Sequence, residues 1–67
     1  MPSVARVTEI SAISETSFED AIKIGIDRAN QTLRNLRSAW VKEQEVEIRD
    51  GKISGYKVNL EVTFVLE

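Results

Sequence analysis

The dipeptide Asp50-Gly51 stands between two extended runs of residues, and it constrains the fold more than any other feature of the chain. An Asp-Gly pair favours a two-residue type I′ turn, because both residues tolerate the left-handed backbone that this turn requires. The flanking runs, residues 38–49 and 52–66, are therefore predicted to form two long antiparallel strands joined as a hairpin.

The second of these strands alternates regularly. From residue 56 onward its apolar side chains occupy every second position, namely Tyr56, Val58, Leu60, Val62, Phe64 and Leu66. This period of two predicts a sheet with one buried face. With a two-residue turn, Arg49 pairs with Lys52, and the register then places Trp40 opposite Glu61.

In the same register Val41 lies opposite Leu60 and belongs to the buried face. The other face then carries four large apolar side chains, namely Trp40, Val46, Ile48 and Ile53. A chain of 67 residues without cysteine has few means of stabilising itself alone, so this apolar surface predicts association with other copies. A bulge in either strand would shift the register by one residue and exchange the faces.

Residues 17–36 show the period of a helix. One apolar stripe contains Phe18, Ala21, Ile22, Gly25, Ala29, Leu33 and Leu36. Thr16 and Glu19 fit a capping box at the start of this helix, with Ser14 as an alternative N-cap. Gly25 lies within the stripe and is expected to allow the close approach of a neighbouring element.

Residues 4–11 mix β-branched and polar side chains and predict a further strand before the helix. The element order is therefore β-α-β-β, which is an α+β fold. We expect a three-stranded antiparallel sheet wrapped around one helix, in a single domain formed by residues 1–67.

Composition excludes several classes of function. The chain has no His and no Cys, which excludes Ser-His-Asp and Cys-His catalysis and cysteine-based metal sites. Its net charge of −2 gives no basis for a nucleic-acid partner. No apolar run approaches the roughly 20 residues of a membrane span, and no signal peptide is recognisable. We therefore expect a cytoplasmic protein without a membrane partner.

Three candidate features remain. Glu43, Glu45 and Glu47 occupy alternate positions of one strand and so share a face, where their oxygens could bind Ca²⁺ or Mg²⁺. Solvated or salt-bridged side chains are the alternative reading. Trp40 could stack against an aromatic ligand or pack at a subunit contact.

Pro2 is the third feature. Removal of Met1 would leave a secondary amine at the N-terminus, which could act as a base, as it does in tautomerase-like enzymes. An ordinary processed N-terminus is the alternative. The sequence shows no paired arginines or apolar pocket pattern around Pro2, and we expect a protein that is not an enzyme.

The order of elements and several segments together resemble the dodecin family. The resemblance is carried by residues 14–18 (SETSF), 26–29 (IDRA), 32–36 (TLRNL), 41–44 (VKEQ) and 56–66 (YKVNLEVTFVL), and it spans nearly the whole chain. The family implies a hollow homododecamer that sequesters flavins, riboflavin or FMN, in pairs at pores between subunits. In its flavin-binding members a Trp on the second strand stacks on the flavin ring, and a Gln on the third strand binds the ring edge.

This sequence departs from the family pattern at both positions. The alignment places Ser38 at the position of the stacking Trp and Lys57 at the position of the Gln. Trp40 lies two residues further on, which keeps the strand face but moves the ring by about 6–7 Å. The resemblance thus predicts Ser38, Trp40 and Lys57 as ligand contacts. Family members without the flavin Trp, some linked to divalent cations, suggest the alternative of a flavin-independent shell with Glu43, Glu45, Glu47 and Glu61 as Ca²⁺ or Mg²⁺ ligands.

Overall fold

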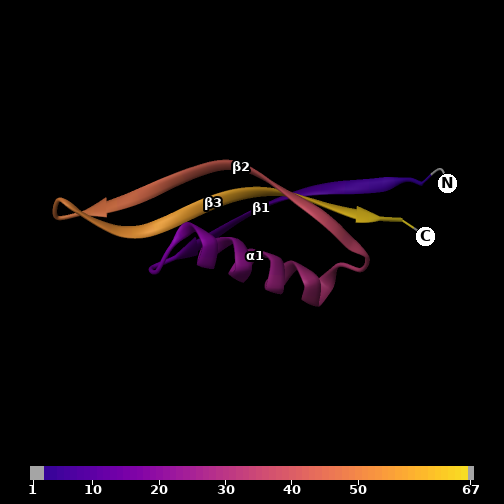
Figure 1. Cartoon of the computed structure of the whole chain (residues 1–67), viewed down its shortest axis with the longest axis horizontal. Coiled ribbons are helices and arrows are strands. Elements are labelled where there is room, and N and C mark those ends of the chain that lie inside the picture. Colours follow the sequence, from indigo (N-terminus) through magenta and orange to yellow (C-terminus); the bar gives the residue numbers. More distant parts are fainter. Residues whose placement is uncertain (1–2, 67) are drawn as a thin grey trace.

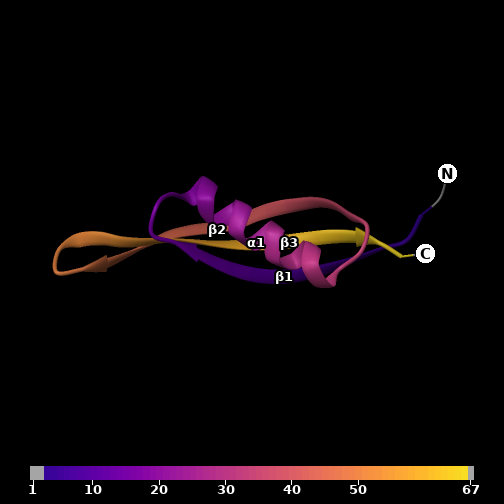
Figure 2. The ribbon, with the colours of Figure 1, turned by 90° about the horizontal axis from the view of Figure 1, so that it is seen from below.

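The structure, a computed structural model, describes residues 3–66. Its elements follow the order β1 (Ala5–Ser14), α1 (Phe18–Thr32), β2 (Leu36–Arg49) and β3 (Lys52–Val65). Strand β3 is the centre of a three-stranded antiparallel sheet, with β1 on one side and β2 on the other. Helix α1 lies across one face of this sheet (Figures 1 and 2). The predicted α+β class, the β-α-β-β order and the sheet around one helix are confirmed.

The core lies between α1 and β3. Val58, Leu60 and Val62 occupy alternate positions of β3 and are at most 1% exposed, as the apolar alternation predicts. On the helix, a Cβ placed on Gly25 would lie 3.2 Å from the Cβ of Ala12 and 3.2 Å from Cδ1 of Leu60. The expected role of Gly25 in a close approach is therefore confirmed, and the neighbour is strand β1 together with the central strand.

The start of α1 corrects the predicted cap. The N-cap is Ser17, whose backbone is extended and whose hydroxyl accepts from the Asp20 N–H at 2.9 Å. Thr16 lies one residue before this position, and its N–H donates to the Ser14 hydroxyl at 2.9 Å instead of to the Glu19 carboxylate of the predicted capping box. The Ser14 hydroxyl in turn donates to the Asp20 carboxylate at 2.6 Å. The cap therefore lies within the predicted region: Ser17 is the N-cap, and the Ser14 hydroxyl holds Asp20 of the first helical turn.

The element boundaries also differ from those predicted. Helix α1 ends at Thr32 rather than near residue 36, because Leu33 already has an extended backbone with φ −107° and ψ 144°. Asn35, with a left-handed φ of 61°, then turns the chain into β2. The Asn35 carbonyl accepts from the Val65 N–H at 3.1 Å. Strand β2 thus begins at Leu36, two residues early, and β1 extends three residues beyond its predicted end because it pairs with β3 as far as Ser14.

The hairpin turn and the register near Trp40 are confirmed. Asp50 and Gly51 have φ values of 53° and 76°, both in the left-handed region that a type I′ turn needs. Arg49 pairs with Lys52, and Trp40 pairs with Glu61.

Between these two regions the register is shifted by one residue. Two irregularities offset the pairing, one at Lys42 on β2 and one at Ser54 on β3, so that Val46 pairs with Tyr56. Directly opposed residues share a sheet face, and the Tyr56 ring packs edge-on against Phe18 of α1, with centroids 5.2 Å apart. Val46 therefore lies on the helix side of the sheet.

The predicted position of the apolar patch was consequently wrong for three of its four members. Ile48 follows Val46 by two residues and pairs with Ile53, so all three aliphatic residues lie on the helix side. Only Trp40 stays on the opposite face. A two-residue turn alone cannot reveal this change, because the two bulges compensate and leave the pairs on either side of the shifted segment, Trp40–Glu61 and Arg49–Lys52, in the simple register.

We call the end of the hairpin, residues 46–55, the arm. It extends past the N-terminal end of α1 (Figure 1) and gives the molecule a longest dimension of 51 Å. Beyond the pair of Ser14 with Tyr56 the sheet has only two strands. Val46, Ile48 and Ile53 are 37%, 67% and 56% exposed there, because neither α1 nor β1 reaches them.

Candidate functional site

All residues predicted to bind a ligand or a metal lie on one face of the sheet. This face, called the outer face, is the one turned away from α1. On β3 its residues alternate with the buried Val58, Leu60 and Val62. The register then places on it Ser38, Trp40, Glu43, Glu45, Glu47, Lys57 and Glu61.

Trp40 is the most prominent side chain of the outer face. It lies opposite Glu61 on β3 and is 62% exposed. Glu9 of β1 lies on the other side of Glu61, and Lys42, at the bulge, places its Nζ 3.5 Å from Glu9 Oε1. The indole therefore stands at the β2 edge of a charged row and presents an open aromatic surface.

Ser38 lies in the neighbouring row, opposite Thr63. A hollow of about 290 Å³ opens beside it between α1 and β2, where Ile26 and Arg37 also contribute to the lining. The short side chain of Ser38 fills little of the space that a larger residue would occupy. The hollow itself lies on the helix side of the sheet, whereas the Trp40 indole lies on the outer face.

Two polar rows continue the outer face toward the arm. In one, the Ser11 hydroxyl donates to Asn59 Oδ1, and Asn59 Nδ2 donates to Glu43 Oε1 at 3.0 Å. In the other, Lys57 Nζ lies 3.4 Å from Glu45 Oε1. Ser11 and Asn59 were absent from the predicted site, although the polar alternation of the third strand indicated the face on which Asn59 lies.

The predicted ligand contacts do not form one pocket within a single chain. Lys57 is four residues from Glu61 along β3, which separates the Lys57 row from the Trp40 row by about 13 Å at ~3.3 Å per residue. Trp40 and Ser38 are neighbours at one end of the outer face, and Lys57 lies toward the arm.

Glu43, Glu45 and Glu47 share one face, as predicted, but the bulge at Lys42 puts them on the outer face and not on that of Val41, and they are not gathered. Glu43 already accepts a hydrogen bond from Asn59, and Glu45 forms an ion pair with Lys57. Glu47 lies beside Gly55, where a Cβ would be 3.1 Å from the Glu47 Oε1. Among residues 3–66, no group of three or more acidic side chains is close enough to hold a metal ion. Pro2 lies outside the described residues.

Comparison with known proteins defines the family. The dodecin family model matches residues 4–67. The chain belongs to the dodecin family. It is 39% identical over 67 residues to a dodecin of Thermus thermophilus, covering 100% of this chain and 97% of the relative. It is 38% identical over 63 residues to the calcium dodecin of Mycobacterium tuberculosis, covering 92% of this chain and 87% of the relative.

Solved dodecin structures share the whole fold. The dodecin from Streptomyces davaonensis superposes with a TM-score of 0.94 at 37% identity, covering 100% of this chain and 98% of that one. The M. tuberculosis calcium dodecin, described as calcium chelating with a novel calcium-binding site, superposes with a TM-score of 0.84 at 36% identity, with coverage of 97% and 93%. In the described part of our chain, α1 is neither long nor apolar enough to cross a membrane.

Proposed function

We propose that this dodecin-family chain is a binding protein rather than an enzyme, and that it assembles into a hollow homododecamer that sequesters a small ligand. Riboflavin or FMN is the first candidate ligand. The observation that carries this proposal is the 62% exposure of Trp40 on the outer face. A large flat indole left open to solvent is suited to stacking against a planar aromatic ring.

The neighbours of Trp40 support a ring at this position. Ser38 precedes Trp40 by two residues on the outer face and has a short side chain, so a ring on the indole can extend over it along β2. The charged row formed by Glu61 and Glu9 bounds the other side. This row fits an uncharged ring system better than an anionic one, because Glu61, directly opposite the indole, forms no ion pair among residues 3–66, whereas Glu9 is paired with Lys42. Riboflavin, which lacks the phosphate of FMN, is therefore expected to bind at least as tightly as FMN.

In the proposed assembly, Lys57 contributes to the ligand site of a neighbouring copy. Its row lies about 13 Å from that of Trp40, so we assign it to a ligand held by the Trp40 of a neighbouring copy. Its ammonium group can donate to a carbonyl or phosphate oxygen but cannot accept. Lys57 therefore replaces only half of the hydrogen bonding that an amide side chain would provide.

A titration of purified protein with riboflavin and with FMN, followed by the quenching of flavin fluorescence, tests the proposal. We expect saturable quenching whose affinity Trp40→Ala weakens by roughly five- to 150-fold, since one stacking contact is worth about 1–3 kcal/mol. Val4→Ala is the matched control, because Val4 is an exposed apolar residue that precedes β1 and lies outside both the Trp40 row and the Lys57 row. Absence of quenching at high protein concentration would overturn the flavin proposal.

Divalent cation binding is the second candidate function. Glu43, Glu45, Glu47 and Glu61 all lie on the outer face, and the M. tuberculosis relative is named a calcium dodecin. In this proposal the carboxylates of neighbouring copies together hold Ca²⁺ or Mg²⁺, because one chain does not gather them. Calorimetric titration of the same protein samples with CaCl₂ and MgCl₂ distinguishes the two functions. Cation binding that persists in Trp40→Ala, without any flavin quenching in the wild type, would favour the cation.

A further inference from the structure

The row of the outer face that contains Trp40 also contains two glutamates. Glu61 lies directly opposite Trp40 on β3, and Glu9 lies directly opposite Glu61 on β1. Directly opposed residues of antiparallel strands have their Cβ atoms about 4.5–5.5 Å apart. The open indole, which is 62% exposed, therefore has a carboxylate as its immediate neighbour across the sheet.

The two carboxylates of this row differ in their pairing. Lys42 Nζ lies 3.5 Å from Glu9 Oε1, so the negative charge of Glu9 is offset. Glu61 takes part in no ion pair or side-chain hydrogen bond among residues 3–66. Like charges directly opposite each other destabilise a sheet, so a bound cation would relieve the repulsion between Glu61 and Glu9.

The indole favours the same sign of ligand charge. The π face of an aromatic ring attracts a cation within about 6 Å of its centroid, and Trp does so more strongly than Tyr or Phe. A neutral planar ring gains only stacking against Trp40. An anionic ring meets both the π face and the Glu61 carboxylate, which repel it.

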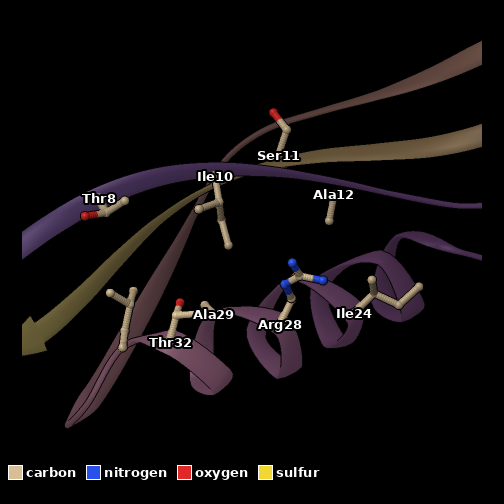
Figure 3. Close-up of a pocket in the computed structure, with 10 residues that line it drawn as sticks. Thr8, Ile10, Ser11, Ala12, Ile24, Arg28, Ala29 and Thr32 are labelled. Carbon is tan, nitrogen blue, oxygen red and sulfur yellow. The ribbon is translucent and has the colours of Figure 1, made fainter.

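The groove on the helix side of the sheet has the opposite character. It opens between α1 and the edge strand β1 with a volume of about 410 Å³ (Figure 3). Its lining is mostly apolar, and Ile24 in this lining is 45% exposed. Within the described part of the chain, Arg28 is the one charged residue that lines it, and Figure 3 shows the Arg28 side chain rising from α1 toward β1. Arg28 repels a cationic ligand from this groove, which leaves the outer face as its binding surface.

We infer that the Trp40 site binds planar aromatic cations in preference to neutral or anionic rings of the same shape, and that Glu61 sets this preference. The inference rests on the proposed function, because it assigns a charge to the ligand of the same site. The indole supplies stacking and cation–π attraction, and the Glu61 carboxylate supplies the neighbouring negative charge. A ring nitrogen that carries an alkyl group gives a ligand the required charge.

Three acridine probes of similar shape test the inference, namely neutral acridine, N-methylacridinium with its fixed positive charge, and an acridine carboxylate. Trp40 is the only tryptophan of the chain, so quenching of its emission reports binding at this site. At mildly alkaline pH and low salt, N-methylacridinium should bind about five- to 30-fold more tightly than acridine. The carboxylate should bind more weakly than acridine. Added sodium chloride should reduce the preference, because it screens exposed charges.

Two substitutions with opposite expected effects locate the preference. Glu61→Gln keeps the side-chain size and should reduce the preference about two- to fivefold. Lys42→Gln leaves Glu9 without its partner and should increase the preference by a similar factor. Glu15→Gln is the matched control, because it removes one negative charge from the loop between β1 and α1, and it should leave the preference unchanged.

The outcomes separate the charge preference from the proposed function. Equal affinities for acridine and N-methylacridinium, with riboflavin still bound, would overturn the charge preference alone. An undiminished preference in Glu61→Gln, with acridine bound as in the wild type, would overturn the role of Glu61. Tight binding of the cation without any binding of riboflavin would support the preference and overturn the flavin proposal. Binding of neither flavin nor acridine probe would overturn both.

Discussion

The covered part of the sheet and the arm are built from the same two strands, yet they end in opposite environments. Beneath α1, β3 is flanked by β1 as well as β2, and Val58 and Leu60 are at most 1% exposed. In the arm there is neither a third strand nor a helix, and Ile48 and Ile53 stay 67% and 56% exposed. Apolar alternation therefore specifies which face needs burial, but the chain itself supplies the covering for only one of the two regions.

The largest expected effect belongs to the covered region. Leu60→Ala should lower the free energy of unfolding by about 2–5 kcal/mol, because Leu60 is 0% exposed and its truncation leaves a cavity against α1. Chemical denaturation followed by circular dichroism measures the change. Val4→Ala, which truncates a residue that is 66% exposed, is the control and should cost well under half as much. A loss below 1 kcal/mol for Leu60→Ala would break the contrast between the regions.

An intermediate effect is expected at the tip of the arm. Gly51 has a φ of 76°, and an L-residue in this left-handed region costs roughly 1–2 kcal/mol. Gly51→Ala should therefore speed hydrogen exchange of the arm amides about tenfold, while the amides of Val58 and Leu60 keep their rates. Gly51→Asn, which tolerates this backbone, should change the rates much less. Equal acceleration in both regions would show that the arm and the covered sheet open as one unit.

The smallest effect is expected where the two regions meet. Lys57 and Glu45 form an ion pair of 3.4 Å. Lys57 lies opposite Ile13, one residue before the end of β1. Lys57→Gln should change the free energy of unfolding by no more than about 0.5 kcal/mol, because the pair is partly exposed and screened by solvent. Lys23→Gln, which removes the more exposed pair with Asp27 on α1, is the comparison variant. A loss above 1 kcal/mol for Lys57 alone would mean that this row anchors the arm.

The candidate site divides in a similar way into predictable and unpredictable parts. The common face of Trp40, Glu61 and Lys57 follows from strand alternation and from the turn, and the sequence was sufficient to predict it. The partners of Glu43 and Glu45 were not predictable, since the bulge at Lys42 sets which residues of β3 they meet. The groove that contains Arg28 gave only one sequence signal, namely that Ile24 falls outside the apolar stripe of the helix.

The sequence by itself determined the elements, their order, the hairpin turn and the central buried strand, because each depends on local periodicity or on backbone preference. Only the tertiary structure decided that Val46, Ile48 and Ile53 face the helix side, and that Ser17 rather than Thr16 caps α1. The first outcome depends on the two bulges in the pairing of β2 with β3. The second depends on which of the neighbouring hydroxyls and N–H groups form hydrogen bonds with one another. A pair of bulges that cancel each other changes the facing of a segment without leaving any trace in the pairing at its two ends.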